Sequence, residues 1–247
     1  MKRVIMVVII AILAAIAYPK VYAQNVKTYI PKNAYSLLEP NRIEADKFAP
    51  EIGPWYFAAL FEHESCLSLV HSKCMNPASE YKRYDKVTNA LVEQGVGLGQ
   101  TTRAFRANGQ LRFDTLAGMK NIYRTHLKDL TWDNIKTRPD LQIRIGILLT
   151  MENYRALNTI TDPTERLYIA DAAYNGGLKD LRQERTLCGL KPGCDPQKWF
   201  GHVEKIVYKS TVKIHNGRSS YEVNRYHVHD VFNNRMNKYK LEYSKLQ

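Results

Sequence analysis

The sequence lacks internal repeats and low-complexity segments, and stretches that alternate apolar and polar residues are scarce. These absences exclude a repeat architecture and disfavour a fold built mainly of strands. Apolar residues are plentiful, at 45% hydrophobic and 11% aromatic, which is ample for a packed core. The length of 247 residues is at the upper end of one domain, or enough for two small ones.

Long apolar runs are also few, and the one at the N-terminus is short. Residues 1–23 begin with Lys2 and Arg3, run apolar from Val4 to Ala17, and end in residues that a signal peptidase accepts. A membrane-spanning helix needs about 20 apolar residues. We therefore predict a cleaved signal peptide and an exported, periplasmic or cell-envelope protein, with an uncleaved anchor as the alternative.

Acidic residues are in the minority, with 24 Asp and Glu against 36 Lys and Arg. Removing residues 1–23 takes Lys2, Arg3 and Lys20 from a net charge of +12 and leaves +9. Outside the cytoplasm, such a charge favours cell-wall polymers or lipid headgroups as partners. Basic residues such as Arg103 and Lys128 are scattered, so we expect no nucleic-acid partner.

Cysteine is rare, with four residues in two close pairs: Cys66 and Cys74, and Cys188 and Cys194. An even count in an exported chain is typical of disulfides. Of the three connectivities, we expect the two local ones.

Zinc is the alternative for the first pair, because His63, Cys66, His71 and Cys74 are all ligand types. Structural zinc fingers separate their ligand pairs by about a dozen residues, and here only four intervene. We therefore predict disulfides, no metal and no cofactor.

Helix signals dominate the rest of the chain. Gly53 and Pro54 start a helix that contains PWYFAALFEHES, and a long apolar periodic run follows Pro139. The segment DPTERLYIADAAYNGG has an N-cap in Asp162, a capping-box pattern with Glu165, and a glycine end.

One short hairpin is expected over residues 107–114, around an Asn-Gly pair. Residues 24–50 contain three prolines and are interpreted as an extended, partly helical lead-in. The domain itself is expected to span residues 51–247.

Two glutamates of the first helix face different ways. At 100° per residue, Phe57, Leu60, Phe61 and Glu64 share one stripe, whereas Glu62 lies about 160° from Glu64. Apolar surroundings disfavour the charged form of a carboxyl group and suit it to act as a general acid. A buried glutamate paired with an arginine is the alternative for Glu64.

Three segments stand in a recognisable order: Glu64-Ser65, GVGLGQTTRAF from Gly95, and IADAAYNGG from Ile169. Together they resemble the lytic transglycosylases with the soluble-type catalytic domain, which share a fold with goose-type lysozymes. The resemblance implies a mainly α, lysozyme-like helical domain with at most a short β-hairpin. It also implies peptidoglycan glycan strands as the substrate, within a cell-envelope or virion setting.

The resemblance implies a role for each matched residue. Glu64 corresponds to the single catalytic acid, and Ser65, Gln100, Tyr174 and Asn175 correspond to substrate-binding positions. Three of these binding positions also have a structural interpretation: Gln100 as a cap, Tyr174 as core, and Asn175 as the end of a helix.

The chain departs from the family pattern in two places. Gly99 stands where the family has a methionine, which removes an apolar wall from the cleft. The family also has a late Glu-Thr-Arg-x-Tyr-Val motif whose tyrosine faces the catalytic acid. Two segments echo it: EKIVYK, with Tyr208, and EVNRYHV, with Tyr226. We favour Tyr226, although a register based on Arg225 and Val228 puts His227 there instead.

The resemblance implies cleavage of the MurNAc-GlcNAc β-1,4 bond by one carboxyl group, with a 1,6-anhydromuramyl end as product. Two other functions stay open. One is a non-catalytic wall-binding or assembly subunit. The other is a hydrolytic muramidase, which needs a second carboxylate. The nearest candidates for it in the sequence are Glu62, Asp85, Glu93 and Asp114.

Overall fold

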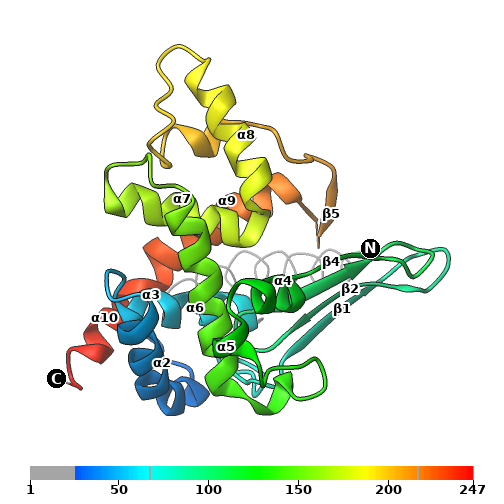
Figure 1. Ribbon diagram of the computed structural model, residues 1–247. Coiled ribbons are helices and arrows are strands. Elements are labelled where there is room, and N and C mark those ends of the chain that lie inside the picture. Colours follow the sequence, from blue (N-terminus) through cyan, green and yellow to red (C-terminus); the bar gives the residue numbers. More distant parts are fainter. Residues whose placement is uncertain (1–25, 67, 216, 247) are drawn as a thin grey trace, which may run out of the picture.

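The protein is mainly helical, as predicted. The computed structural model describes residues 26–66, 68–215 and 217–246, and the predicted signal peptide lies outside them. None of the helices in these ranges has the length and apolarity that a membrane span requires. Figure 1 shows helices on both sides of the long helix α6, with a sheet extending to one side.

The helices follow one another through most of the described chain. In order they are η1 Lys32–Ala34, α2 Tyr35–Phe48, α3 Pro54–Ser65, α4 Thr115–Ile122, α5 Arg124–Leu127, η2 Ile135–Thr137, α6 Pro139–Arg155, α7 Pro163–Gly176, α8 Leu178–Gly189, η3 Val203–Lys205, α9 Ser220–His229, the π-helical segment η4 Asp230–Arg235, and α10 Met236–Tyr243.

The lead-in was predicted to be extended and partly helical, and it is more helical than expected, because most of its described part is helix α2. Leu38 and Ala45, two turns apart, are buried where α2 packs against α3 and α6. Glu44 and Arg144 join α2 to α6 at 2.6 Å. The prolines misled the interpretation, since Pro40 lies inside the helix.

Helix α3 forms the centre of the core. It begins at the predicted place, with Gly53 as N-cap and Pro54 in the first turn. All residues from Tyr56 to Phe61 are buried. The helix contacts α2, η4 and α10, so its sequence is apolar nearly all round.

Helix α7 also begins and ends where the sequence predicts. The carboxylate of Asp162 accepts hydrogen bonds from the backbone N–H groups of Thr164 and Glu165, and Gly177 ends the helix with a φ of 85°. The second half of the capping box is absent. Glu165 instead accepts a hydrogen bond from the N–H of Trp199 at 2.8 Å.

The sheet is larger than predicted. The hairpin around Asn108 and Gly109 is confirmed, but it belongs to a four-stranded antiparallel sheet in the order β1-β2-β3-β4. The limit of one short hairpin is therefore wrong. The exposed and half-buried residues of β1 show no regular two-residue alternation, which hid this strand. The strands are β1 Glu80–Tyr84, β2 Leu91–Val96, β3 Thr101–Phe105 and β4 Leu111–Asp114.

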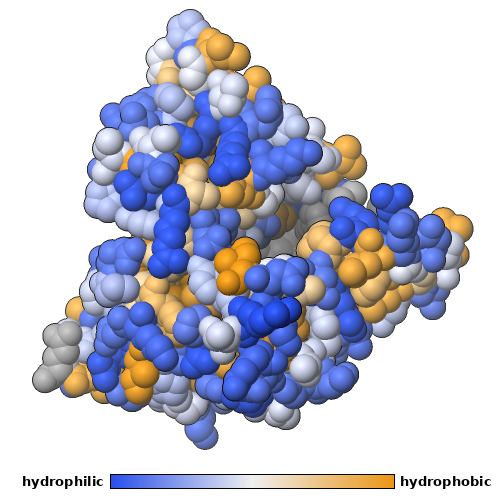
Figure 2. All heavy atoms as spheres, in the orientation of Figure 1, coloured by the Kyte–Doolittle hydropathy of each residue, from blue (hydrophilic) through white to orange (hydrophobic). Residues whose placement is uncertain are grey.

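The sheet protrudes from the helices beside α4 (Figure 1). Figure 2 shows hydrophobic residues gathered over this protruding part, on a face that is otherwise largely hydrophilic. The exposed apolar side chains there include Val87, Leu111 and Phe113.

The C-terminal part forms a small strand pair and then a continuous helical segment. The strands β5 Lys213–His215 and β6 Arg218–Ser219 lead into α9, which has a capping box between Ser219 and Glu222. The chain stays helical after Val228, with the π-helical segment η4 between α9 and α10. Such segments are frequent at functional sites.

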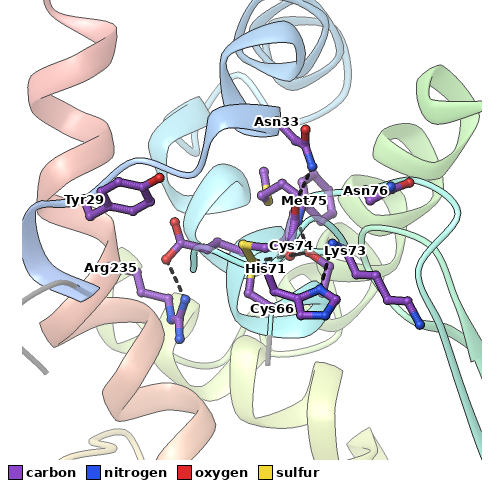
Figure 3. Close-up of a disulfide and its surroundings, with 12 residues drawn as sticks. Tyr29, Asn33, Cys66, His71, Lys73, Cys74, Met75, Asn76 and Arg235 are labelled. Carbon is purple, nitrogen blue, oxygen red and sulfur yellow. Dashed lines mark hydrogen bonds and ion pairs between the residues drawn. A yellow bond between two sulfur atoms is a disulfide. The ribbon is translucent and has the colours of Figure 1, made fainter. Parts of the chain in front are cut away.

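Both predicted disulfides are confirmed, with local pairing. Cys66–Cys74 joins the end of α3 to the loop after it, and Cys188–Cys194 does the same for α8. The backbone carbonyl of Cys74 also accepts a 2.8 Å hydrogen bond from the side chain of Asn33 (Figure 3). The loop is therefore tied to two helical segments.

Candidate active site

Glu64 lies near the end of α3, on the wall of a cavity of about 450 Å³. Phe57, Leu60 and Phe61 of the predicted stripe are fully buried, as is the rest of α3 from Tyr56 to Glu62, and Glu64 follows with 15% of its side chain exposed. Its carboxyl group is therefore backed by the core and open to the cavity on one side.

Segments that are far apart in the sequence meet at this cavity. Five of the six predicted catalytic and substrate-binding residues line it: Glu64, Ser65, Gln100, Tyr174 and Asn175. They come from α3, from the turn between β2 and β3, and from the end of α7. The three motifs of the sequence analysis thus form one site.

Gln100 is held in the tight turn that joins β2 to β3. Its φ of 46° is in the left-handed region, which is unusual for a residue other than glycine and recurs at functional sites. Its side-chain amide donates to the carbonyl of Gly97 at 2.8 Å, and its own carbonyl accepts from Thr102 at 2.6 Å. Gln100 therefore shapes the turn as well as lining the cavity.

Tyr174 spans the cavity wall between α7 and the turn. Its hydroxyl donates to the carbonyl of Gly99 at 2.7 Å. Burial raises the pKa of Tyr174 well above its usual value, and the nearby carboxylates of Glu64 and Asp171 raise it further. The hydroxyl is therefore a neutral donor.

Asn175 is the next residue after Tyr174, and its side-chain oxygen accepts a hydrogen bond from Asn224 of α9 at 3.1 Å. Asn224 also donates to the carbonyl of Ala172. The end of α7 is thus fixed to α9, which sets the direction of Asn175 at the cavity.

Ser65 is tied into the fold, although it borders the cavity. Its hydroxyl donates to the carbonyl of Phe61 at 2.7 Å and accepts from the N–H of Met75 at 3.1 Å. Its donor is therefore used within the protein, and its effect is to hold the loop after the first disulfide against α3.

The zinc alternative is wrong for this loop, because the sulfur atoms of Cys66 and Cys74 are bonded to each other. His63 is engaged elsewhere, with Nδ1 at 2.8 Å from Asp230. Among the described residues, no group of three or more His, Cys, Asp or Glu side chains is arranged to hold a metal ion.

The late-motif residue that contacts Glu64 is one position later in the sequence than the residue that we favoured. Tyr226 does not line the cavity of Glu64; its ring lies under the guanidinium of Arg218 and beside His63. His227 contacts Glu64 instead, with Nδ1 3.2 Å from Oε1. Tyr208, the other candidate, is 47% exposed. The register based on Arg225 and Val228 therefore describes the contact.

His227 is buried between two carboxyl groups. Its Nδ1 faces Glu64 of α3, in an ion-pair contact that lacks the angle of a well-aligned hydrogen bond. Its Nε2 lies 3.3 Å from the carboxylate of Asp171 on α7, and Asp171 also accepts a 2.7 Å hydrogen bond from the hydroxyl of Tyr56. One imidazole thus connects α3, α7 and α9.

These carboxyl groups determine the charge of the imidazole. Burial by itself lowers the pKa of His227, but Asp171 and Glu64 outweigh it and raise the pKa from 6.5 to about 10. His227 is therefore a cation at neutral pH, and it places a positive charge next to Glu64.

Glu62 has quite different surroundings. It is fully buried, and α10 covers it: Lys238 lies 2.7 Å from Oε1, and the hydroxyl of Tyr239 donates to Oε2 at 2.6 Å. Arg235, just before α10, contacts Oε1 at 2.5 Å. Glu62 therefore holds the C-terminal segment in place and is not available to a substrate.

The two buried networks meet through a pair of histidines. The rings of His63 and His227 are 4.5 Å apart, and Asp230 joins His63 to Arg235. Burial lowers the pKa of His63, and the charge of His227 lowers it further, against the opposing effect of Asp230. A neutral His63 thus lies beside a charged His227.

The other acids considered for a second carboxylate are mostly committed elsewhere. Asp85 caps the turn between β1 and β2, and Asp114 caps α4 and accepts from Trp132. Glu93 lines the cavity with Glu64, and two nitrogens of Arg83 contact its carboxylate at 2.7 and 3.0 Å.

The structure adds Glu80 to the carboxylates of the cavity, although the sequence analysis did not consider it. Burial raises the pKa of Glu80, but hydrogen bonds from Lys136, Gln94 and Lys82 outweigh this and lower the pKa to about 2. Glu80 is therefore ionised at neutral pH.

The site continues past Gln100 and Tyr174 into a second cavity of about 470 Å³. Phe113 of the sheet and Asn153 of α6 line this extension, and Asn175 borders both cavities. Phe113 is 46% exposed and presents an aromatic ring of the kind that packs on the apolar face of a ligand. The two cavities together suit an extended ligand.

The sequence analysis missed Asp171, and it considered His227 only as the alternative to Tyr226. A signal for Asp171 was present, because a carboxylate within the apolar run IADAA needs a buried partner. What the sequence did not provide was the partner's identity, since 56 residues separate Asp171 from His227.

No model of a known protein family matches the chain, and no curated protein matches its sequence significantly.

Proposed function

We propose that the protein is a peptidoglycan lytic transglycosylase that cleaves the MurNAc-GlcNAc β-1,4 bond and leaves 1,6-anhydromuramyl ends. One observation carries the proposal. The three sequence segments that resemble this family converge on a single cavity, with Glu64 on its wall and Gln100, Tyr174 and Asn175 around it.

Glu64 carries out both proton transfers of the reaction. In its protonated form it gives a proton to the glycosidic oxygen as the bond to C1 of the muramic acid breaks. As a carboxylate it then takes the proton of the C6 hydroxyl while that oxygen bonds to C1. The proton count of the enzyme is unchanged at the end, and no water is consumed.

The neighbouring residues orient the sugar. Tyr174 and Asn175 are fixed by hydrogen bonds to Gly99 and Asn224, and Gln100 is fixed by its turn, so the wall changes little when a ligand binds. Such positioning contributes several kcal/mol to lowering a barrier when the geometry is right. The extension past Asn175 gives a glycan strand room beyond the reacting bond.

The disulfides support export, since such bonds persist in oxidising compartments. The net charge, +9 without the predicted signal peptide, supports attraction to anionic wall polymers. We therefore place the protein in the periplasm or cell envelope, with peptidoglycan as its partner and without a cofactor.

A hydrolytic muramidase is the second candidate, and a specific observation favours retaining it. Glu93 and Glu80 line the same cavity as Glu64, so a second carboxylate is present at the site. Both are held by cations: Glu93 by Arg83, and Glu80 by Lys136. A carboxylate paired with a cation is less able to activate water than an unpaired carboxylate.

Mass spectrometry of digested peptidoglycan tests the proposal. The wild type should release muropeptides one water lighter than hydrolytic products, and Glu64→Gln should lose at least about a hundredfold of the activity. Glu93→Gln and Glu80→Gln serve as matched controls and should retain most activity. Hydrated reducing ends, together with inactivity of either control, would assign the protein to the muramidases. Wall binding without any cleavage would indicate a non-catalytic subunit.

A further inference from the structure

Three side chains from three helices form a buried row that ends at the cavity. Asp171 of α7 contacts Nε2 of His227 on α9, and Nδ1 of His227 contacts Glu64 of α3. Asp171 and His227 are fully buried, whereas Glu64 opens to the cavity. Burying a charged histidine and a carboxylate has a desolvation cost that their pairing offsets only in part, so the fold retains this row at an energetic cost.

We propose that His227, anchored by Asp171, is a positioning residue for Glu64. It holds Oε1 of the carboxyl group and leaves Oε2 for the substrate, and it stabilises the carboxylate that exists after the proton has left. This inference rests on the proposed function of Glu64 as acid and base. It adds an Asp171–His227 pair that the family resemblance does not contain.

The geometry accounts for how the pair acts. Asp171 accepts a hydrogen bond from Tyr56 and faces Nε2, so the ring orientation of His227 is set from behind. In the charged ring Nδ1 also carries a hydrogen, and it is the nitrogen that faces Glu64. The 3.2 Å contact is imperfectly aligned in the ligand-free site, and such bonds commonly tighten when substrate binds.

The opposite charges of Asp171 and His227 explain why Glu64 is still able to act as an acid beside a cation. Asp171 compensates the positive charge of His227, so the pair adds a donor to the site without adding net charge. The protonation states of His227 and Asp171 stay unchanged throughout the reaction, and only the proton of Glu64 moves. Further titratable groups surround the ring: His63 and Tyr56 on α3, Tyr174 on α7, and Asp230 on η4 through His63.

The first test needs no substrate. Imidazole ¹H–¹⁵N correlation spectra of the full chain, assigned with His227→Gln, should show His227 charged at neutral pH and losing its proton near pH 10. In Glu64→Gln and in Asp171→Asn the midpoint should fall, because each variant removes a negative charge beside the ring. A midpoint that is the same in wild type and Glu64→Gln would overturn the proposal.

The second test measures activity. Asp171→Asn should lower kcat by roughly tenfold to a hundredfold with little change in KM, because misorientation at the reacting group affects the chemical step. It should also add a decline in kcat at alkaline pH, as His227 now loses its proton within the measured range. Asp162→Asn is the matched control, because Asp162 caps the same helix and Asn is an equally good N-cap residue. This variant should behave as wild type.

The outcomes separate the two proposals. If the wild type releases no anhydromuropeptides, the proposed function fails, and the spectra still decide whether the three groups are coupled. If the wild type is active and Asp171→Asn is folded by circular dichroism with an unchanged kcat profile, the positioning role is overturned. If Asp171→Asn does not fold, the spectra of Glu64→Gln decide, because Glu64 lies at the cavity wall and its substitution leaves the core intact.

Discussion

The hydroxyl of Tyr174 occupies the space that a side chain at position 99 would need. It lies 2.7 Å from the carbonyl oxygen of Gly99, and a Cβ built on Gly99 would be 2.6 Å from the same hydroxyl. The glycine that departs from the family pattern is thus coupled to the tyrosine that matches it.

Gly99→Ala should therefore displace Tyr174 and reduce activity by at least about tenfold, with a loss of roughly 1 to 3 kcal/mol in unfolding free energy from overpacking. Gly118→Ala is the control, because a Cβ there meets no atom within 4 Å, and Ala is the better helix former. Muropeptide release and urea unfolding measure the two effects. An unimpaired Gly99→Ala enzyme would show that this hydrogen bond does not matter for the cavity.

Glu62→Gln should destabilise the protein strongly, unlike Glu64→Gln. Glu62 and Asp230 together balance the charges of Arg235 and Lys238, so removing one carboxylate leaves a buried positive charge without compensation. Breaking a buried pair in this way costs about 3 to 5 kcal/mol. Urea unfolding of both variants checks it, and equal stabilities would mean that water reaches this network.

The two disulfides should differ in what their loss does. Each closes a short loop, with sequence separations of 8 and 6, and should contribute about 2 to 3 kcal/mol to stability. Cys74 lines the cavity of Glu64, whereas the second disulfide lies at the end of α8. Replacing Cys66 and Cys74 by serine should lower both melting temperature and activity. Replacing Cys188 and Cys194 should lower the melting temperature alone, and a matching loss of activity would contradict this.

The stability contributed by His227 should depend on pH in one direction. Its pKa is about 10 in the folded protein against a usual 6.5, so the folded state retains a proton that the unfolded state releases. The contribution is fully present below about pH 6.5 and is lost as pH rises toward 10. Unfolding free energy should therefore fall more steeply over this window in wild type than in His227→Gln. Parallel curves would indicate that His227 is not charged.

Local signals in the sequence were enough for several elements. Gly53 and Pro54 began α3, and Asp162 and Gly177 bounded α7, because capping groups satisfy backbone atoms within one turn. The predicted cysteine pairs were also correct, since close spacing along the chain favours local pairing. The limit of a single hairpin was wrong, and the lead-in is more helical than the predicted extended, partly helical segment. Helix α2 contains Pro40 and packs against α3 and α6, and β1 has no regular exposure pattern and pairs with β2. These contacts between elements are not visible in the local sequence.

The sequence by itself determined the mainly helical class, the two disulfides, and the direction of Glu64 at the end of an apolar stripe, because helical period and chain spacing are local properties. Only the tertiary structure decided that His227 rather than Tyr226 contacts Glu64, and that Asp171 anchors it. One residue along α9 turns a side chain by about 100°, so the register depends on how α9 packs against α3 and α7. That packing is a sum of contacts between segments far apart in the chain, with 56 residues between Asp171 and His227 and 163 between Glu64 and His227, and no local pattern encodes it.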